Sequence, residues 1–404
     1  MRDPLSPDTS LPVVRLLPKA EARAIRHGFP WVYANELVMD RRTKALAPGT
    51  LALLEDGERR AMGIVAFNPA SKIAGRMLDR DPHAVIDEGW FARRLEAALA
   101  HRSRLYDAPF YRLVHAEADG LPGVVIDRYG DLAVVQPNAA WAEARLDALV
   151  AALVRVTGVG TVVKNASGRA RALEGLDEET QVLTGAVAGP VEVPMNGATY
   201  MADVLGGQKT GLFYDQRPNH AFVAGLARAQ DVLDLFSHVG GFGLAALASG
   251  ARRVLAVDGS QPALDLALQG ARAGGVADRL DALRSDAFKA LEALAAENRR
   301  FGVVVCDPPA FAPSKPALEA GLRAYEQLAR QAARLVEAGG YLVLCSCSHA
   351  ADLAAFRAAS TRGIGKAGRS AQIVHTGFAG PDHPQHPQLA ESGYLKALVY
   401  RILP

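Results

Sequence analysis

The sequence predicts an α/β protein in three parts: an N-terminal β-barrel, a small central α/β domain, and a C-terminal parallel sheet with helices on both faces. Length is the first observation, since 404 residues correspond to two or three domains at about 100–200 residues each. The second is a series of short apolar runs separated by turn residues before about residue 80. The third is the alternation of apolar strands with Ala- and Leu-rich helices after about residue 230, typical of a parallel sheet. We therefore place the domains at 1–82, 83–190 and 191–404.

Composition excludes several classes of protein. Half of the residues are apolar and 22% are charged, which excludes a disordered chain. No run approaches the roughly 20 apolar residues that span a bilayer, and the acidic, proline-containing N-terminus lacks a signal core, so we expect no membrane and no export. The three cysteines lie in the last quarter, which favours a reducing cytoplasm over a disulfide framework. The net charge of +2 argues against whole-molecule steering to nucleic acid, but not against a local basic patch.

The N-terminal segment reads as a small barrel. The apolar runs 51–54 and 61–67 flank an acidic turn at 55–58, and residues 1–80 carry a net charge of +4. Before them, Pro18–His27 is predicted to be a short helix that places Lys19, Arg23 and Arg26 on one cationic face. That face has two interpretations, a solvated surface or a stripe that faces phosphate.

The central segment is predicted to mix helices and strands. A helix is expected over Glu88–Tyr106, followed by a hairpin that joins Gly123–Asp127 to Leu132–Gln136. A second helix is expected over Ala140–Val156, and a strand over Gly160–Lys164.

The C-terminal segment gives the clearest pattern. The expected elements, strand first and then alternating with helices, are 231–236, 242–249, 253–258, 262–274, 280–285, 287–297, 303–306, 316–337 and 341–345. A final strand beginning at Tyr394–Lys396 is expected to be an antiparallel edge strand. Ligands of such sheets bind beyond the carboxyl ends of the strands.

An acidic residue lies at or near the end of each of the first three strands of this segment. Asp234 precedes the glycine-rich turn that contains Gly240, Asp258 ends the second strand, and Asp286 follows the third. Residues 241–246 match G-x-G-x-x-A, but the glycines do not directly follow the strand, and a carboxylate beside a dinucleotide's pyrophosphate would be unfavourable. S-adenosylmethionine (SAM) has an ammonium group, a ribose diol and an adenine, and the three acids could bind these groups in that order. For each aspartate alone, a helix cap or turn is the competing interpretation.

Two later strand ends carry the candidate catalytic residues. Asp307 is followed by Pro308 and Pro309, which stiffen a loop that can hold a flat, amine-bearing ring. Cys347 lies at the carboxyl end of the next strand, where ligands bind, whereas Cys345 and Cys306 read as core cysteines. One Cys-x-Cys pair offers two metal ligands, too few for a structural zinc site, so no metal is expected.

Several strings resemble the RlmI family, SAM-dependent methyltransferases that make 5-methylcytosine in large-subunit (23S) rRNA. They are Asp234–Phe242, Asp307–Phe311, Ser346–Ser348, Ala116–Arg128 and Gly207–Arg217. The resemblance covers nearly the whole chain. It implies an RNA-binding PUA barrel over Leu16–Leu78, a Rossmann-like class I methyltransferase domain at the C-terminus, and rRNA as the partner.

The resemblance also implies a mechanism. Cys347 matches the nucleophile that adds to carbon 6 of cytosine, so that carbon 5 can attack the methyl group of SAM. Asp307, if protonated or sharing a proton with the base, could stabilise charge at ring nitrogen 3. Ala310 stands where some relatives have a second cysteine, so the acceptor of the carbon-5 proton stays open, with water or Asp307 as alternatives.

The expected site residues form two further sets. We expect the cofactor to contact Phe213, Asp234, Phe236, Ser237, Gly240, Asp258, Asp286, Asp307 and Pro308. We expect RNA to contact Lys19, Arg23, Arg26, Lys209, Arg217 and Lys315. For Lys209, Asp215 and Arg217, an ion-paired loop that braces the domain is the competing interpretation.

Three alternative functions stay open at this point. A methyltransferase acting on a ring or exocyclic nitrogen would use Asp-Pro-Pro without a thiol. A non-catalytic RNA-binding assembly factor could keep the same fold, and a nicotinamide dehydrogenase is a third, more distant alternative. The sequence does not specify which nucleotide is modified. The substrate is either naked rRNA or an assembly particle. A homodimer is one alternative for the oligomeric state.

Overall fold

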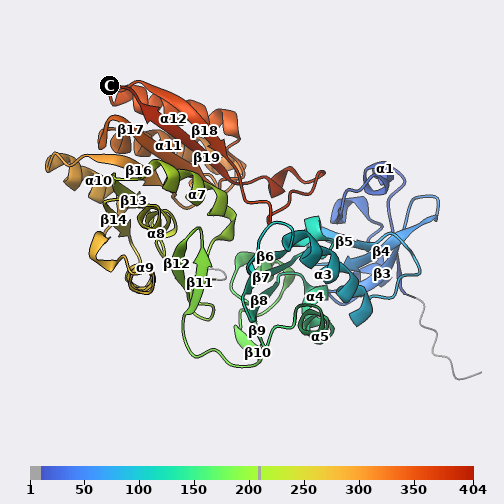
Figure 1. Ribbon diagram of the computed structural model, residues 1–404. Coiled ribbons are helices and arrows are strands. Elements are labelled where there is room, and N and C mark those ends of the chain that lie inside the picture. Colours follow the sequence, from blue (N-terminus) through green and yellow to red (C-terminus); the bar gives the residue numbers. More distant parts are fainter. Residues whose placement is uncertain (1–10, 208–210) are drawn as a thin grey trace, which may run out of the picture. The chain divides into compact units, whose positions relative to one another are not determined.

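The structure is a computed structural model that describes residues 11–207 and 211–404. The chain divides into two compact units. Unit 1 contains the residues up to Val187 together with His386–Leu389, and unit 2 contains Ala188–Gln385 and Ala390–Pro404. Figure 1 labels the elements of both units.

Unit 1 begins with a five-stranded sheet in the order β1-β3-β4-β5-β2. β1 pairs in parallel with β3, and the other pairings are antiparallel. Alternate residues of the strands fill one core, to which Val14, Leu54 and Phe67 contribute without exposure to solvent. The elements are β1 (Val13–Arg15), α1 (Ala22–Arg26), β2 (Trp31–Tyr33), α2 (Arg41–Lys44), β3 (Thr50–Glu55), β4 (Ala61–Phe67) and β5 (Ile73–Asp79).

A second five-stranded sheet of unit 1 has the order β10-β9-β8-β7-β6. Helix α3 (Glu88–Arg102) packs on it with α5, because its apolar side carries Trp90 and Phe91 into a core that also contains Trp141. The rings of Phe91 and Trp141 stack with centroids 5.8 Å apart. The remaining elements are β6 (Phe110–His115), β7 (Val124–Tyr129), β8 (Leu132–Pro137), α4 (Ala140–Glu143), α5 (Leu146–Thr157), β9 (Thr161–Lys164), α6 (Arg169–Glu174) and β10 (Gln181–Thr184).

Unit 2 is built on a seven-stranded sheet in the order β15-β14-β13-β16-β17-β19-β18. The first five strands in this order are parallel and the last two are antiparallel to their neighbours. A two-stranded antiparallel sheet of β11 (Val191–Met195) and β12 (Ala198–Ala202) precedes it. The strands are β13 (Asp231–Leu235), β14 (Arg253–Asp258), β15 (Leu280–Arg284), β16 (Phe301–Cys306), β17 (Val336–Ser346), β18 (Ala371–Gly377) and β19 (Lys396–Ile402).

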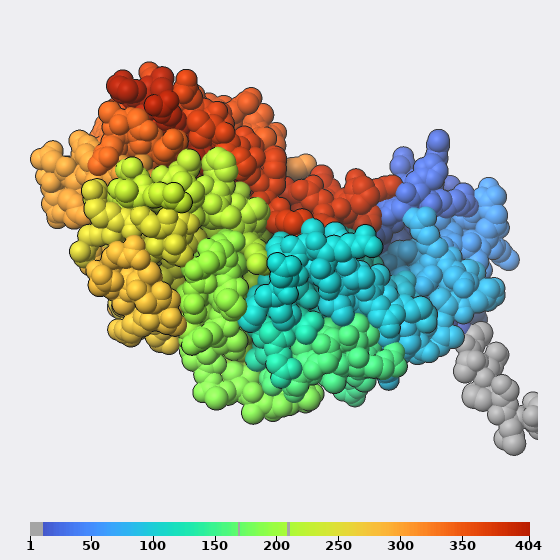
Figure 2. Space-filling view, in the orientation of Figure 1, coloured from blue at the N-terminus to red at the C-terminus, as the bar shows by residue number. Residues whose placement is uncertain are grey.

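Helices cover both faces of this sheet. Three of them, α10, α11 and α12, enclose a core in which Leu233, Val304 and Leu342 are fully buried. On the opposite face α8 approaches β13 and β14 closely, and α7 adjoins β18, where Phe222 stacks on His375 with centroids 3.9 Å apart (Figures 1 and 2). The helices are α7 (Arg217–Leu226), α8 (Gly241–Ala248), α9 (Gln261–Ala273), α10 (Ala287–Ala296), α11 (Leu318–Ala333) and α12 (Leu353–Lys366).

Three of the predicted elements differ clearly from the structure. The helix expected over Pro18–His27 is the five-residue α1, which lacks a side-chain N-cap, so Lys19 lies before the helix. The helix expected over Ala140–Val156 is split at Arg145, whose backbone is not helical. The final strand is antiparallel, as expected, but it is not at the edge, because β18 pairs along its outer side.

Candidate functional site

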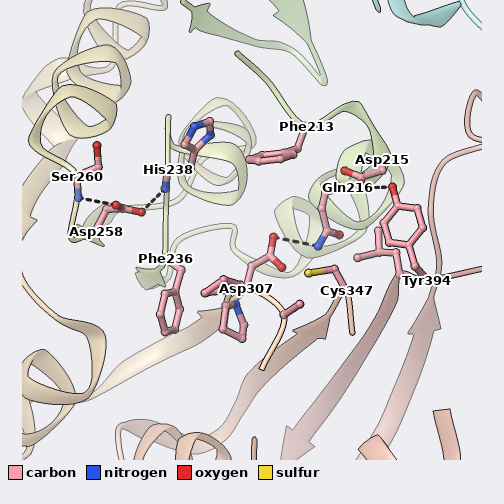
Figure 3. Close-up of a pocket in the computed structure, with 14 residues that line it drawn as sticks. Phe213, Asp215, Gln216, Phe236, His238, Asp258, Ser260, Asp307, Cys347 and Tyr394 are labelled. Atoms are coloured by element: carbon pink, nitrogen blue, oxygen red, sulfur yellow. Dashed lines mark hydrogen bonds between the residues drawn. The ribbon is translucent and has the colours of Figure 1, made fainter. Parts of the chain in front are cut away.

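A cavity of about 480 Å³ opens in unit 2 beyond the carboxyl ends of β13, β14, β16 and β17 (Figure 3). This is the edge at which ligands bind in sheets of this kind. The lining residues are Phe213, Asp215, Gln216, Phe236, His238, Asp258, Ser260, Asp307, Pro308, Pro309, Ala310, Cys347, Tyr394 and Leu395.

The loop after β13 forms one wall of the cavity. Phe236 (φ +60°) and His238 (φ +49°) both have left-handed backbone conformations, which are unusual for residues other than glycine. This conformation directs the His238 backbone N–H to Asp258 Oδ2 over 2.8 Å, while the Ser260 N–H donates to Oδ1 over 2.8 Å. The Asp258 carboxylate is thereby fixed at the cavity wall, and its remaining lone pairs can accept hydrogen bonds from a diol.

Asp234 lies under this loop rather than in the lining. Its side chain is buried, and Oδ2 accepts a hydrogen bond from the Gly243 backbone N–H over 2.8 Å. A Cβ at Gly243 would lie 2.9 Å from Val254 Cγ1 and 3.1 Å from Asp234 Oδ2, so the glycine permits the close approach of α8. Burial, with smaller contributions from Asp307 and Asp258, raises the pKa of Asp234 to about 7.

These features fit a cofactor that carries a cation and a ribose. Asp234 Oδ1 is buried and, within the described residues, has no hydrogen-bond partner. Such an atom favours a nearby positive group, because an isolated buried carboxylate is costly. Asp258 supplies acceptors for the ribose, and the rings of Phe236 and Phe213 supply apolar surface. The donor and acceptor set is therefore compatible with SAM and unfavourable for a pyrophosphate.

Asp307 lies at the centre of the cavity, on the loop after β16. The Gln216 side-chain Nε2 donates to Asp307 Oδ2 over 3.0 Å, and Gln216 Oε1 accepts from Asn219 Nδ2 over 2.7 Å. Asn219 also donates to the Phe378 backbone carbonyl oxygen. This chain of hydrogen bonds orients the Gln216 amide so that it presents N–H to Asp307.

Cys347 differs from the other two cysteines. It is half-buried and lines the cavity, whereas Cys306 and Cys345 are buried and burial raises the pKa of both thiols. In Figure 3 the Cys347 sulfur points toward Asp307 and Gln216. Among the three, Cys347 is the thiol that a ligand in the cavity can reach.

Buried polar contacts fix the Cys347 loop. The Tyr325 hydroxyl is hydrogen-bonded to Ser346 Oγ at 2.9 Å and to Ser348 Oγ at 2.8 Å. Ser348 Oγ also accepts from the backbone N–H of Ala312, which lies on the loop that follows Asp307. The loops of Asp307 and Cys347 are thereby joined through side chains that solvent does not reach.

Lys396 supports the Cys347 loop from β19. Its Nζ donates to the backbone oxygens of Ser348 over 2.8 Å and Ala351 over 2.7 Å. The side chain is buried, and burial lowers the pKa of Lys396 while the nearby Cys347 and Asp352 raise it. Lys396 is therefore close enough to Cys347 for the two groups to interact electrostatically.

On the Tyr394 side of the cavity, a hydrogen bond joins two segments that are far apart in the sequence. The Tyr394 hydroxyl, just before β19, donates to Asp215 Oδ2 over 2.5 Å. Asp215 is 7% exposed, and its Oδ1 has no hydrogen-bond partner among the residues that the structure describes.

The expected cofactor residues fall into two groups. Five line the cavity: Phe213, Phe236, Asp258, Asp307 and Pro308. The others lie outside the lining: Asp234 and Ser237 are buried, Gly240 is the residue before α8 with φ +84°, and the exposed Asp286 accepts the N-cap hydrogen bond of α10 from the Lys289 N–H.

The expected RNA-contacting residues that the structure describes are divided between the two units. Lys19 is exposed before α1; Arg23 and Arg26 lie on α1, where Arg26 pairs with Asp56. In unit 2, Arg217 is the first residue of α7 and Lys315 is exposed on the loop after Asp307. Lys209 lies outside the described residues.

Sequence reasoning did not identify eight of the lining residues as site residues: Asp215, Gln216, His238, Ser260, Pro309, Ala310, Tyr394 and Leu395. The first three lie in strings that carry the family resemblance, which was a usable signal. For Tyr394 the sequence gave no signal beyond its position before a strand, because its contact with Asp215 joins residues 179 positions apart.

In residues 11–207 and 211–404, there is no group of three or more His, Cys, Asp or Glu side chains that could hold a metal ion. Within the same residues, every helix is too short or too polar to cross a membrane.

Two family models match the chain. A PUA-like domain matches residues 14–80, and an S-adenosylmethionine-dependent methyltransferase matches residues 137–401. Together with the structural likeness below, they confirm the predicted fold class.

Curated relatives match along nearly the whole chain. A protein of Alteromonas mediterranea named ribosomal RNA large subunit methyltransferase I is 36% identical over 391 residues, covering 96% of this chain and 98% of the relative. A Vibrio cholerae protein of the same name is 34% identical over 396 residues, with coverage of 96% and 98%.

Solved structures share the fold. A candidate SAM-dependent methyltransferase from Streptococcus mutans superposes with a TM-score of 0.80 at 19% identity, covering 97% of this chain and all of the other. A second candidate methyltransferase, solved with SAH, gives a TM-score of 0.81 at 19% identity, with the same coverage.

Proposed function

Because the chain belongs to the ribosomal RNA large subunit methyltransferase I family of SAM-dependent methyltransferases, we propose that it methylates carbon 5 of a cytosine in large-subunit rRNA through a covalent adduct with Cys347. SAM as methyl donor follows from the family. The observation that supports the finer proposal is that Cys347, Asp307 and Asp258 line one cavity at the carboxyl edge of the sheet.

We assign the cofactor-binding role to the Asp258 side of the cavity. Asp258 would bind the ribose hydroxyls, since both of its oxygens are already oriented by backbone N–H groups. The buried Oδ1 of Asp234 would interact with the positively charged amino-acid end of SAM. When bound, SAM supplies an electrophilic methyl group.

We assign the chemistry on the base to Cys347 and Asp307. The Cys347 thiolate adds to carbon 6, which makes carbon 5 a nucleophile strong enough to take the methyl group. Asp307 accepts hydrogen bonds from the amino-pyrimidine edge and holds the ring against Cys347. The positive charge of Lys396 favours the Cys347 thiolate. The hydrogen bonds of the Tyr325 hydroxyl hold the Asp307 loop and the Cys347 loop in fixed positions. The base would leave its stack to enter the cavity.

We assign RNA binding to the N-terminal PUA-like domain and to exposed cations of the methyltransferase domain. Arg23 and Lys315 are exposed, whereas Arg26 is already paired with Asp56 and has less capacity for phosphate. We retain the division at 1–82, 83–190 and 191–404 as a functional hypothesis, with phosphate contacts from the first and third segments. Free cysteines and an rRNA substrate are consistent with a cytoplasmic enzyme.

We retain a homodimer as a hypothesis for unit 2. Edge strand β18 and the following residue expose three apolar side chains: Ile373, Val374 and Phe378, each more than 40% exposed. An edge strand with exposed apolar side chains is a candidate for strand pairing between copies. Light scattering of the wild type and of Val374→Lys would test it, since a dimer through this edge should dissociate in the variant.

Covalent trapping tests the proposed chemistry. Purified enzyme, SAM and unmodified large-subunit rRNA in which cytidine is replaced by 5-fluorocytidine should form an adduct that survives denaturing electrophoresis, because fluorine at carbon 5 cannot leave as a proton does. Cys347→Ala should abolish the adduct, whereas Cys345→Ala, which changes a thiol outside the cavity, should retain it. Methylation at an undiminished rate by Cys347→Ala would instead favour a nitrogen methyltransferase.

A further inference from the structure

The proposed reaction needs an acceptor for the proton on carbon 5. Ala310 follows Pro309 in the cavity and has no group that can accept a proton. The lining side chains with nitrogen or oxygen acceptors are Asp215, Gln216, His238, Asp258, Ser260, Asp307 and Tyr394. His238 and Ser260 lie on the Asp258 side of the cavity (Figure 3). Asp258 is held by two backbone N–H groups on the His238 side, away from Cys347 (Figure 3). Asp307 already accepts from Gln216 and is assigned to the edge of the base.

Tyr394 is placed beside the Cys347 loop. Its ring lies 5.7 Å, centroid to centroid, from the ring of His349, which is two residues after Cys347. Lys396, two residues after Tyr394, holds the backbone oxygen of Ser348. Figure 3 shows the Tyr394 hydroxyl on the same side of the cavity as Cys347, directed to Asp215.

Asp215 is suited to receive the proton of Tyr394. The hydroxyl donates to its Oδ2 over 2.5 Å, a short contact of the kind made by charged acceptors. The second oxygen, Oδ1, has no hydrogen-bond partner in the described part of the chain and is buried. Asp215 therefore has one oxygen that already contacts the phenolic proton and a second oxygen whose hydrogen-bonding capacity is unused within the described residues.

We propose that Tyr394 is the catalytic residue that takes the carbon-5 proton and that Asp215 takes the phenolic proton in return, a role that rests on the proposed function. The C5–H bond breaks as its proton moves to the Tyr394 oxygen, whose own proton moves to Asp215 Oδ2. The electron pair of that bond forms the C5=C6 double bond, and the C6–S bond breaks to return a thiolate to Cys347. Asp215 loses its proton to water after the product leaves.

Trapping without any modified base tests this role. Tyr394→Phe should complete addition and methyl transfer but fail at proton removal, so that a methylated RNA–enzyme adduct accumulates from ordinary cytidine. Methyl-labelled SAM would show the adduct on a denaturing gel. We expect turnover to fall at least about a hundredfold, the usual range for loss of general base catalysis. Asp215→Asn, which keeps an acceptor for the hydroxyl but cannot take its proton, should accumulate the same adduct.

The controls separate this proposal from the proposed function. Tyr400→Phe removes a hydroxyl elsewhere in unit 2 and should behave as the wild type. Wild-type turnover by Tyr394→Phe, or slow turnover without a labelled adduct while SAM still binds, would overturn the role of Tyr394. Methylation by Cys347→Ala would instead remove the covalent mechanism itself, whatever the tyrosine variant does.

Discussion

At the scale of single residues, the site depends on how each acid or thiol is surrounded. Two cysteines two positions apart differ completely: Cys345 is enclosed in the sheet, while Cys347 faces the cavity. The sequence predicted this difference from the position of Cys347 at the carboxyl end of a strand, where ligands bind. It could not predict Lys396 as a neighbour of Cys347, because that contact depends on how β19 inserts into the sheet.

Lys396 gives a residue-scale prediction. Replacing it with Met removes the cation near Cys347 and the two hydrogen bonds to the loop, so the pKa of the Cys347 thiol should rise. The rate of iodoacetamide alkylation, followed against pH, should shift to higher pH in Lys396→Met and much less in Lys396→Arg. Cys306 and Cys345 should contribute little to labelling, since both are buried. An unchanged pH profile of alkylation would show that Lys396 does not activate the Cys347 thiol.

At the scale of elements, the strand ends bring the chemistry together. The sheet aligns β13, β14, β16 and β17, so Asp258, Asp307 and Cys347 meet although they lie far apart in the sequence. Alternating strands and helices made this predictable, because parallel strands end at a common edge. The sequence did not predict β18 or the pair β11 and β12, since short strands with mixed polarity lack a clear period.

The hydroxyl network between loops gives an element-scale prediction. Tyr325→Phe leaves Ser346 and Ser348 with one partner fewer in a buried environment, which should lower the free energy of unfolding by about 1–3 kcal/mol. Urea unfolding would measure this loss. The variant should also methylate more slowly at saturating substrate, because the Asp307 and Cys347 loops lose a common support. A variant as stable and active as the wild type would show that the network does not hold the loops.

At the scale of the whole molecule, Asp234 is expected to affect both the free energy of unfolding and the binding of SAM. The pKa of this buried carboxyl is raised to about 7, above its ordinary value of 3.8, so the folded protein binds its proton more tightly than the unfolded chain does. Stability from this group is therefore present at low pH and is lost as the pH rises from about 4 toward 7.

Asp234→Asn tests this pH dependence. The amide keeps an acceptor for the Gly243 N–H but does not ionise, so the variant should gain stability relative to the wild type as the pH rises from 5 to 8. The difference is bounded by about 4 kcal/mol. Urea unfolding of both proteins at each pH would measure it. A difference in unfolding free energy between the two proteins that stays constant with pH would contradict the raised pKa of Asp234. The same variant should bind SAM more weakly, because it loses the negative charge proposed to favour the cofactor's amino group.

The central claim is that Cys347 performs cytosine-5 methylation of large-subunit rRNA. Its most direct test is mass mapping of modified nucleosides in that rRNA from cells that lack the gene and carry either the wild-type chain or Cys347→Ala. We predict that deletion removes one 5-methylcytosine, that the wild type restores it, and that the variant does not although it is expressed and binds SAM. An rRNA whose 5-methylcytosines are unchanged by the deletion, or restored by Cys347→Ala, would contradict the claim.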